Sequence, residues 1–152
     1  GTVNKPNFDE VFARFCEYEE RASATADAMQ AAILSRMDAN EALVNLNIRM
    51  EQIQAAARNE LDTVWQEMYN ANRDAGKNKK EDPKKPTSND YFVAANDAVN
   101  DSGIKVKIVD TEREISKLGV SIDGLQIEFA LCMALVKAVG NALEGISVLM
   151  SR

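Results

Sequence analysis

The last quarter of the chain decides the fold, and it reads ISKLGVSIDGLQIEFALCMALVKAVGNALEGISVLM from residue 115 to residue 150. Apolar residues recur along it in steps of three and four without exception. They are Ile115, Leu118, Ile122, Leu125, Phe129, Cys132, Val136, Val139, Leu143, Ile146 and Met150. This spacing is typical of a helix that packs along one continuous seam. Because Thr111 and Glu114 also match a capping box, we predict a C-terminal coiled-coil helix over 111–150.

A second apolar row lies beside this seam. Its members are Leu131, Leu135, Ala138, Ala142, Gly145 and Leu149. A single helix partner would leave this row in water, because the apolar face is wider than one seam. The C-terminal helix is therefore expected to have more than one partner, within the chain or from neighbouring copies.

Residues 7–73 form a predicted N-terminal helical segment, since no glycine or proline interrupts them and helix-forming residues are plentiful. The second half of this segment carries a further heptad seam with one four-residue stutter near Ala57. The seam residues are Leu43, Leu46, Met50, Ile53, Ala57, Leu61, Val64 and Met68. A single helix of this length exceeds the usual range. Polar clusters at 23–27 and 38–41 are candidate breaks, so the choice between one helix and two stays open.

The middle of the chain is polar. Residues 74–90 hold five lysines and two prolines without a large apolar side chain, which predicts a flexible loop. Residues 91–110 predict a short helix that Gly103 ends, followed by an extended segment. Ile104 to Ile108 alternates apolar and basic residues, as a short strand does.

These elements indicate an all-α fold: a long helical hairpin or coiled coil with a polar loop excursion and one short strand. The 152 residues are expected to form a single helical domain, with 41–73 packed antiparallel on 121–150. Trp65 and Tyr69 lie one turn apart, and we expect them to pack against the C-terminal helix rather than bind a ligand.

The composition argues against most catalytic chemistry. The chain has no histidine, which removes His general bases, Ser–His and Cys–His pairs and His-ligated metals. No glycine-rich phosphate loop is present. Cys16 and Cys132 lie far apart and fall on apolar rows, so we expect two free buried thiols. We predict that the protein is not an enzyme and has no cofactor and no metal site.

Charge and hydropathy bear on the partners. The net charge of −6 gives nucleic acid binding no global electrostatic support, so no nucleic acid partner is expected. The most apolar stretch, 125–150, carries Glu128, Lys137 and Glu144. A membrane span needs about 20 nearly uncharged residues, and we therefore predict no transmembrane span.

The layout resembles the extracellular filament and needle-tip subunits of bacterial type III secretion systems, in particular the EspA-like proteins. The matching parts are 31–68, the polar excursion 70–110, and 119–152. The resemblance implies secretion to the bacterial cell surface after a cytoplasmic stage, polymerisation into a filament, and a secretion chaperone as a partner besides other copies of the chain. It assigns self-assembly to the C-terminal seam residues Ile122, Leu125, Phe129, Cys132, Val136, Val139, Leu143, Ile146 and Met150.

A second hypothesis is a helical-bundle binding module, either an extracytoplasmic sensor domain or a cytosolic adaptor or chaperone. It predicts a discrete monomer or small oligomer whose melting temperature rises with its ligand. The filament hypothesis instead predicts assembly that grows with concentration.

Overall fold

The computed structural model describes residues 8–152, and the helices in it confirm the all-α fold with hairpin-like packing. The elements are α1 (Phe8–Asp74), a 3-10 turn η1 (Gly76–Asn78), α2 (Ser88–Ser102) and α3 (Ile104–Met150). The predicted start at residue 7 lies outside the described residues. The chain divides into two compact units. Unit 1 contains residues up to Asp38 together with Glu114–Arg152, and unit 2 contains Ala39–Arg113.

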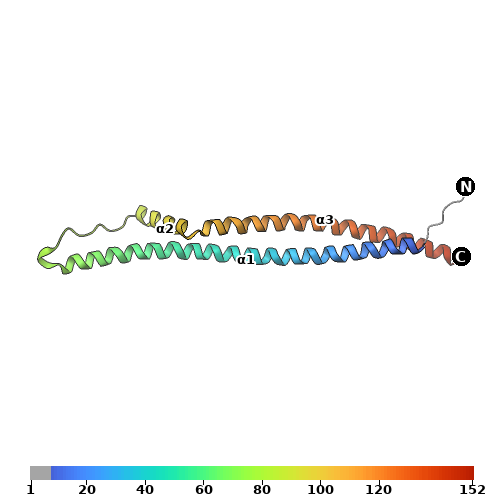
Figure 1. Cartoon of the computed structure of the whole chain (residues 1–152), viewed down its shortest axis with the longest axis horizontal. Helices are drawn as coiled ribbons and strands as arrows, with labels where there is room; N and C mark the ends of the chain where they lie inside the picture. The colour runs from blue at the N-terminus through green and yellow to red at the C-terminus, as the bar shows by residue number, and fades with distance from the viewer. Residues whose placement is uncertain (1–7) are drawn as a thin grey trace. The chain divides into compact units, whose positions relative to one another are not determined.

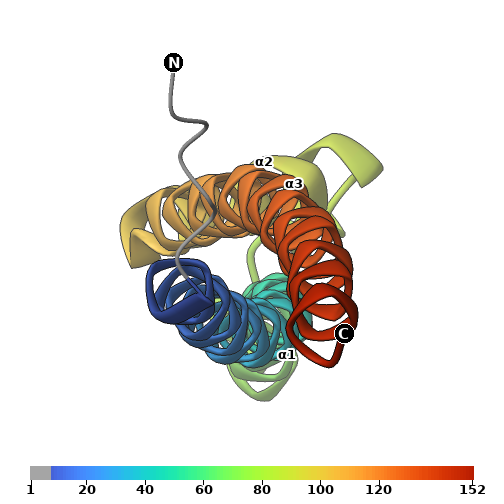
Figure 2. The ribbon, with the colours of Figure 1, turned by 90° about the vertical axis from the view of Figure 1, so that its right-hand side faces the viewer.

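Unit 1 is a pair of antiparallel helical segments, the first half of α1 and the main part of α3 (Figures 1 and 2). The predicted packing of 41–73 on 121–150 is wrong, because 121–150 belongs to one unit with the residues up to Asp38, and 41–73 belongs to the other. The most buried residues of unit 1 on α1 are Ala22 and Thr25, and those on α3 are Ile122 and Cys132. The less exposed positions of both helices recur in steps of three and four, which places one face of each helix against the other. The apolar seam predicted from Ile115 to Met150 is confirmed as this inner face as far as Ile146, whereas its last member, Met150, is exposed.

The first helix is unbroken from Phe8 to Asp74, which settles the choice that the sequence left open. The candidate break at 23–27 contains Thr25, whose hydroxyl donates to the Arg21 carbonyl at 2.8 Å. Thr25 is 6% exposed, so its polar group is satisfied inside the helix instead of capping a new one.

Unit 2 holds the rest of α1, the loop, all of α2 and the first turns of α3. Thr87 caps α2 in a capping box, since its hydroxyl accepts from the Asp90 amide while the Asp90 carboxylate accepts from the Thr87 amide. Gly103 ends α2 in the left-handed conformation at φ 71°, as predicted, and α3 follows directly. The buried side chains here include Val99 and Ile104.

The strand predicted at 104–108 is wrong, because these residues are the first turns of α3. Ile104 is 3% exposed and Ile108 is half-buried, whereas Val106 is 64% exposed. Two apolar residues four apart share a helix face as readily as alternate residues share a strand face. A helix therefore buries the same pair.

The capping box predicted at Thr111 and Glu114 is also wrong, and α3 does not begin at residue 111. Thr111 lies two turns inside α3, where its hydroxyl donates to the Lys107 carbonyl at 2.8 Å. The pattern of the two residues allows a cap, but α3 has already begun at Ile104, directly after Gly103.

The predicted seam of α1 holds from Leu43 to Leu61 and then fails. Trp65 and Tyr69 are the half-buried residues that follow, while Val64 and Met68 are 46% and 55% exposed. Beyond Ala57 the less exposed positions step by four, so the inner face turns gradually around the helix.

Candidate interaction surface

The nine residues to which the resemblance assigns self-assembly do not form a free surface in a single chain. Ile122 and Cys132 are buried, and Met150 is 71% exposed. The other six are half-buried along the inner face of α3: Leu125, Phe129, Val136, Val139, Leu143 and Ile146. The hairpin of unit 1 therefore already uses most of this seam.

The second apolar row lies largely in the open. Leu135 is half-buried, and the other five members are exposed. Large apolar side chains accumulate on this side of α3, with Val120 and Ile127 both 72% exposed, Leu131 56% exposed and Leu149 66% exposed. A contiguous row of this kind is uncommon on monomeric proteins and typically marks an interface.

We call the exposed side of α3, opposite the inner seam, the outer face. It consists of Val120, Gly124, Ile127, Leu131, Ala134, Ala138, Asn141, Gly145 and Val148, all exposed. Asn141 is its one polar member. The second apolar row predicted from the sequence shares only Leu131, Ala138 and Gly145 with this face. The other positions were missed because glycine, alanine and asparagine among them do not give a clear apolar repeat.

The glycines of α3 differ in their surroundings, because one adjoins the facing helix and others lie on the outer face. A Cβ added to Gly140 would lie 3.4 Å from the Phe15 ring, so Gly140 adjoins the facing helix of unit 1. A Cβ added to Gly124 or Gly145 would meet no atom within 4 Å. Nothing within the chain therefore requires glycine at these two outer positions.

The polar loop of unit 2 is tied to α1 (Figure 1). The Trp65 indole donates to the Pro83 carbonyl at 3.1 Å, and Trp65 stacks on Tyr69 with ring centroids 5.5 Å apart. The Asn72 side chain accepts from the Lys80 amide at 2.8 Å and donates to the Lys80 carbonyl at 2.9 Å. The prediction that both aromatic residues pack against the C-terminal helix is thus not met, because Trp65 bonds to the loop and Tyr69 stacks on Trp65. The flexibility of the loop stays a prediction.

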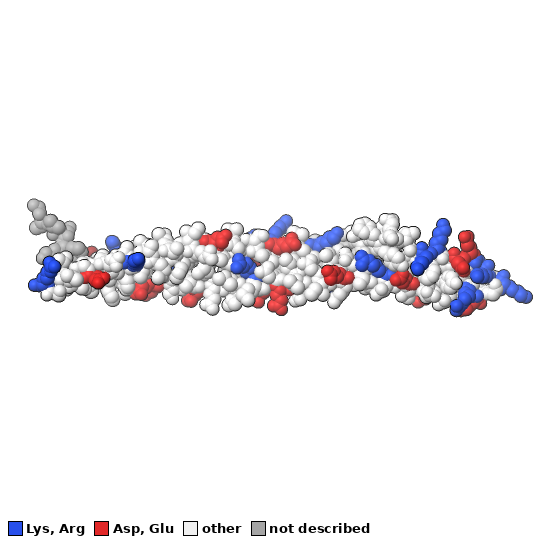
Figure 3. All heavy atoms as spheres, turned by 180° about the vertical axis from the view of Figure 1, so that it is seen from behind, with Lys and Arg blue, Asp and Glu red and all other residues white. Residues whose placement is uncertain are grey.

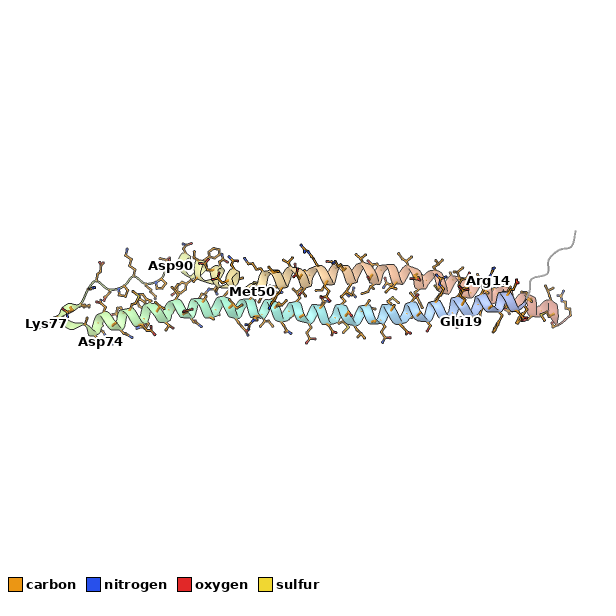
Figure 4. All side chains as sticks on the ribbon, viewed as in Figure 1. Arg14, Glu19, Met50, Asp74, Lys77 and Asp90 are labelled. Atoms are coloured by element: carbon orange, nitrogen blue, oxygen red, sulfur yellow. The ribbon has the colours of Figure 1, made fainter. Side chains whose placement is uncertain are left out.

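Asp74 is the last residue of α1, and Lys77 lies in η1, the turn that begins this loop (Figure 4). Charged side chains of both signs are interspersed over the face that Figure 3 draws. The five loop lysines therefore do not stand on an otherwise basic surface, and Glu81 and Asp82 lie among them.

Two ionisable groups of unit 2 have shifted pKa values. Hydrogen bonds with Thr87 lower the pKa of Asp90 below its usual 3.8. The bond with the Thr87 backbone is the larger cause, and the bond with its side chain is the smaller one. The Tyr91 hydroxyl donates to the Asp62 carboxylate, and this bond raises the pKa of Tyr91 above its usual 10.0. Both groups are solvent-exposed and fasten α2, so they act in structure rather than in a cavity.

Unit 2 also has shallow hollows. One of about 380 Å³ is lined by residues of α1 and α2 that include Leu61, Val64 and Ala98 together with Glu60 and Asp97. Another of about 560 Å³ is lined by residues that include Arg49 and Lys107. Over residues 8–152, no group of three His, Cys, Asp or Glu side chains is placed to hold a metal ion.

The two cysteines are free thiols. Cys132 is fully buried on the inner face of α3, as predicted, whereas Cys16 on α1 is half-buried.

One described helix, α3, is long and apolar enough to cross a membrane by length and composition alone. Its most apolar window has a mean hydropathy of 1.5 and is 11% buried. Core helices of soluble proteins that pass the same test are mostly buried, unlike this window. The predicted lack of a transmembrane span stays a prediction.

Comparison of the chain with protein-family models, with curated proteins and with solved structures finds no significant match in any of the three. The class that the fold and surface define is thus an all-α helical hairpin with an exposed apolar face on its C-terminal helix.

Proposed function

We propose that this chain is a non-enzymatic structural protein that self-assembles through its C-terminal helix. The finer form of the proposal is a subunit of an extracellular filament or tip of a bacterial secretion apparatus, and this form rests on the resemblance in sequence layout. A secretion chaperone that covers α3 before export belongs to the same proposal.

The observation that carries the proposal is the row of large apolar side chains on the outer face of α3. Burying an exposed Ile or Leu side chain contributes about 1.5–3 kcal/mol. Val120, Ile127 and Leu131 are more than half exposed, so most of that free energy is still available to a contact. A second copy of the chain is the partner that is present wherever the protein is made.

The inner seam is a poor place to test this proposal. Val136 is half-buried in unit 1, so a charge there would damage the hairpin itself. Ile127 is 72% exposed, so Ile127→Asp changes the outer face and leaves the hairpin intact. Gln126→Asp is the matched control, because Gln126 is an exposed neighbour outside the outer face.

Light scattering over a roughly hundredfold range of concentration is the test, since mass action makes association depend on concentration. The parent and Gln126→Asp are expected to gain mass, and Ile127→Asp to stay monomeric. Electron microscopy of the concentrated parent then checks for filaments. A parent that stays monomeric throughout would contradict self-assembly and favour the helical-bundle binding module. Binding to neutral phospholipid vesicles without any gain in mass would instead assign the outer face to a membrane surface.

A further inference from the structure

We propose that unit 2 binds a small amphiphile with one anionic group, a carboxylate or a phosphate, between Arg49 of α1 and Lys107 of α3. The anionic group lies between the two cations, and a short apolar chain enters the slot beside Gly103. This site lies apart from the outer face of α3. The inference therefore goes beyond the proposed self-assembly and does not depend on it.

Two adjoining hollows form the site. The larger has a volume of about 560 Å³ and the smaller one of about 120 Å³, and they share Leu46, Arg49 and Lys107. Sites for small molecules typically have volumes of about 300–1,000 Å³. Every residue that lines either hollow belongs to unit 2, so one compact unit contains the whole site.

The break between α2 and α3 produces the smaller hollow, which we call the slot. Ser102 and Ile104, on either side of Gly103, line it together with Leu46 and Ile53 of α1, which passes this break (Figure 1). Gly103 has no side chain, and a Cβ built on it would meet no atom within 4 Å, so no other group of the chain fills the space directly beside it. Ile104 is buried, while Leu46 and Ile53 are half-buried. These three side chains give the slot an apolar wall.

Arg49 and Lys107 bring two positive charges to the hollows without a carboxylate bound to either. Over residues 8–152, neither side chain forms an ion pair, because both ion pairs found there involve other residues. Charges that flank the contact of two packed helices commonly have opposite signs and pair with each other. Two like charges at one hollow repel instead, and an anion between them replaces this repulsion by attraction.

The two cations suit an anionic group in different ways. The Arg49 guanidinium presents a planar fork that donates two parallel hydrogen bonds to a carboxylate or phosphate, whereas the Lys107 ammonium acts as a point charge. The hydroxyls in the lining already have partners. Ser102 donates to the Val99 carbonyl at 2.6 Å, and Thr111 donates to the Lys107 carbonyl at 2.8 Å. The cations are therefore the groups that select the ligand.

Asp110 limits where the anionic group lies. It is the one carboxylate among the described residues that line the two hollows, and it lines only the larger one. The slot thus has two cations and no carboxylate beside it, which favours an anionic group at the slot. Both cations are solvent-exposed, so salt screens the attraction and a dissociation constant of about 0.1–1 mM is expected.

Titration of the full chain with hexyl phosphate and with hexanoate, followed by the NMR shifts of the backbone amides, tests the site. Hexanol lacks the charge, and inorganic phosphate lacks the apolar chain. At least one of the two amphiphiles is expected to bind about tenfold more tightly than both of these probes, with the largest shifts at residues that line the hollows. Equal binding of hexanol would overturn the role of the cations, and equal binding of inorganic phosphate would overturn the role of the slot. No binding of either amphiphile up to about 10 mM would overturn the site itself.

Substitutions locate the binding on the two cations. Arg49→Gln and Lys107→Gln are each expected to weaken it about tenfold, and Asp110→Asn to strengthen it. Lys105→Gln is the matched control, because Lys105 is an exposed lysine of the same helix that lines neither hollow. Unchanged affinity in Arg49→Gln and Lys107→Gln, or an equal loss in Lys105→Gln, would overturn the assignment.

Two further measurements on the same samples keep the results separate. A helical circular dichroism spectrum for each variant ensures that loss of binding is not loss of folding. Light scattering reports the mass of the parent independently of the ligand. A parent that binds the amphiphile and stays monomeric contradicts the proposed self-assembly alone, whereas a parent that gains mass and binds neither amphiphile contradicts this inference alone.

Discussion

Replacing Gly124 with alanine should stabilise the folded monomer. Gly124 lies in the interior of α3, and an added Cβ meets no atom within 4 Å. The substitution therefore removes the conformational freedom of glycine from the unfolded chain without a steric cost in the folded one. Helix propensity alone gives an increase of about 1 kcal/mol in the free energy of unfolding. In a protein of this length, that corresponds to a rise of about 2–4 °C in the melting temperature.

Gly103→Ala is the matched control with the opposite sign. Its added Cβ also meets no atom within 4 Å, but Gly103 has φ 71°, in the left-handed region. An alanine there costs about 1–2 kcal/mol, because its Cβ approaches the following carbonyl oxygen. The two substitutions change the same atoms and differ only in backbone conformation.

Urea unfolding followed by circular dichroism at low protein concentration measures both variants as monomers. The midpoint should rise for Gly124→Ala and fall for Gly103→Ala, with the dependence on urea unchanged. A lower midpoint for Gly124→Ala would refute the reasoning, since it would mean that the monomer itself needs glycine at this position.

Four further outcomes test the rest of the structure. Trp65→Phe removes the hydrogen bond to the loop, so the loop lysines should become more sensitive to trypsin while the helix content stays the same. Thr87→Ala removes the cap of α2 and should lower the free energy of unfolding by about 1 kcal/mol in urea titrations. The low pKa of Asp90 means that its contribution is present above pH 3.8 and is lost as the pH falls through the folded-state value. Because the larger cause is the backbone amide of residue 87, which Thr87→Ala keeps, the parent and this variant should both lose stability in acid and keep most of their difference. Native protein should react with a thiol reagent at Cys16 well before Cys132, and comparable rates would contradict the full burial of Cys132.

The sequence alone predicted several parts of this fold because they depend on local periodicity. The inner seam of α3 and the seam of α1 from Leu43 to Leu61 follow directly from apolar residues at heptad spacing. The end of α2 at Gly103 follows from the conformational freedom of glycine.

The errors share one physical cause. Ile104 and Ile108 fit a strand and a helix equally well by spacing, and Thr111 with Glu114 fits a cap that the preceding turns of helix make unnecessary. Short patterns of this kind have more than one local solution, and the packing of Ile104 in unit 2 selects the helix.

The candidate surface shows the same division. The sequence determined that α3 has more apolar width than one partner can cover, since that depends only on the order of residues along a helix. The pattern also ranked the two sides, since large apolar residues occupy nearly every position of the inner seam. Only the tertiary structure decided that the hairpin covers Ile122 and Cys132 and leaves Ile127 and Leu131 in solvent. Whether a second helix of the chain covers the other side depends on how the helices pack, which the order of residues along one helix does not contain.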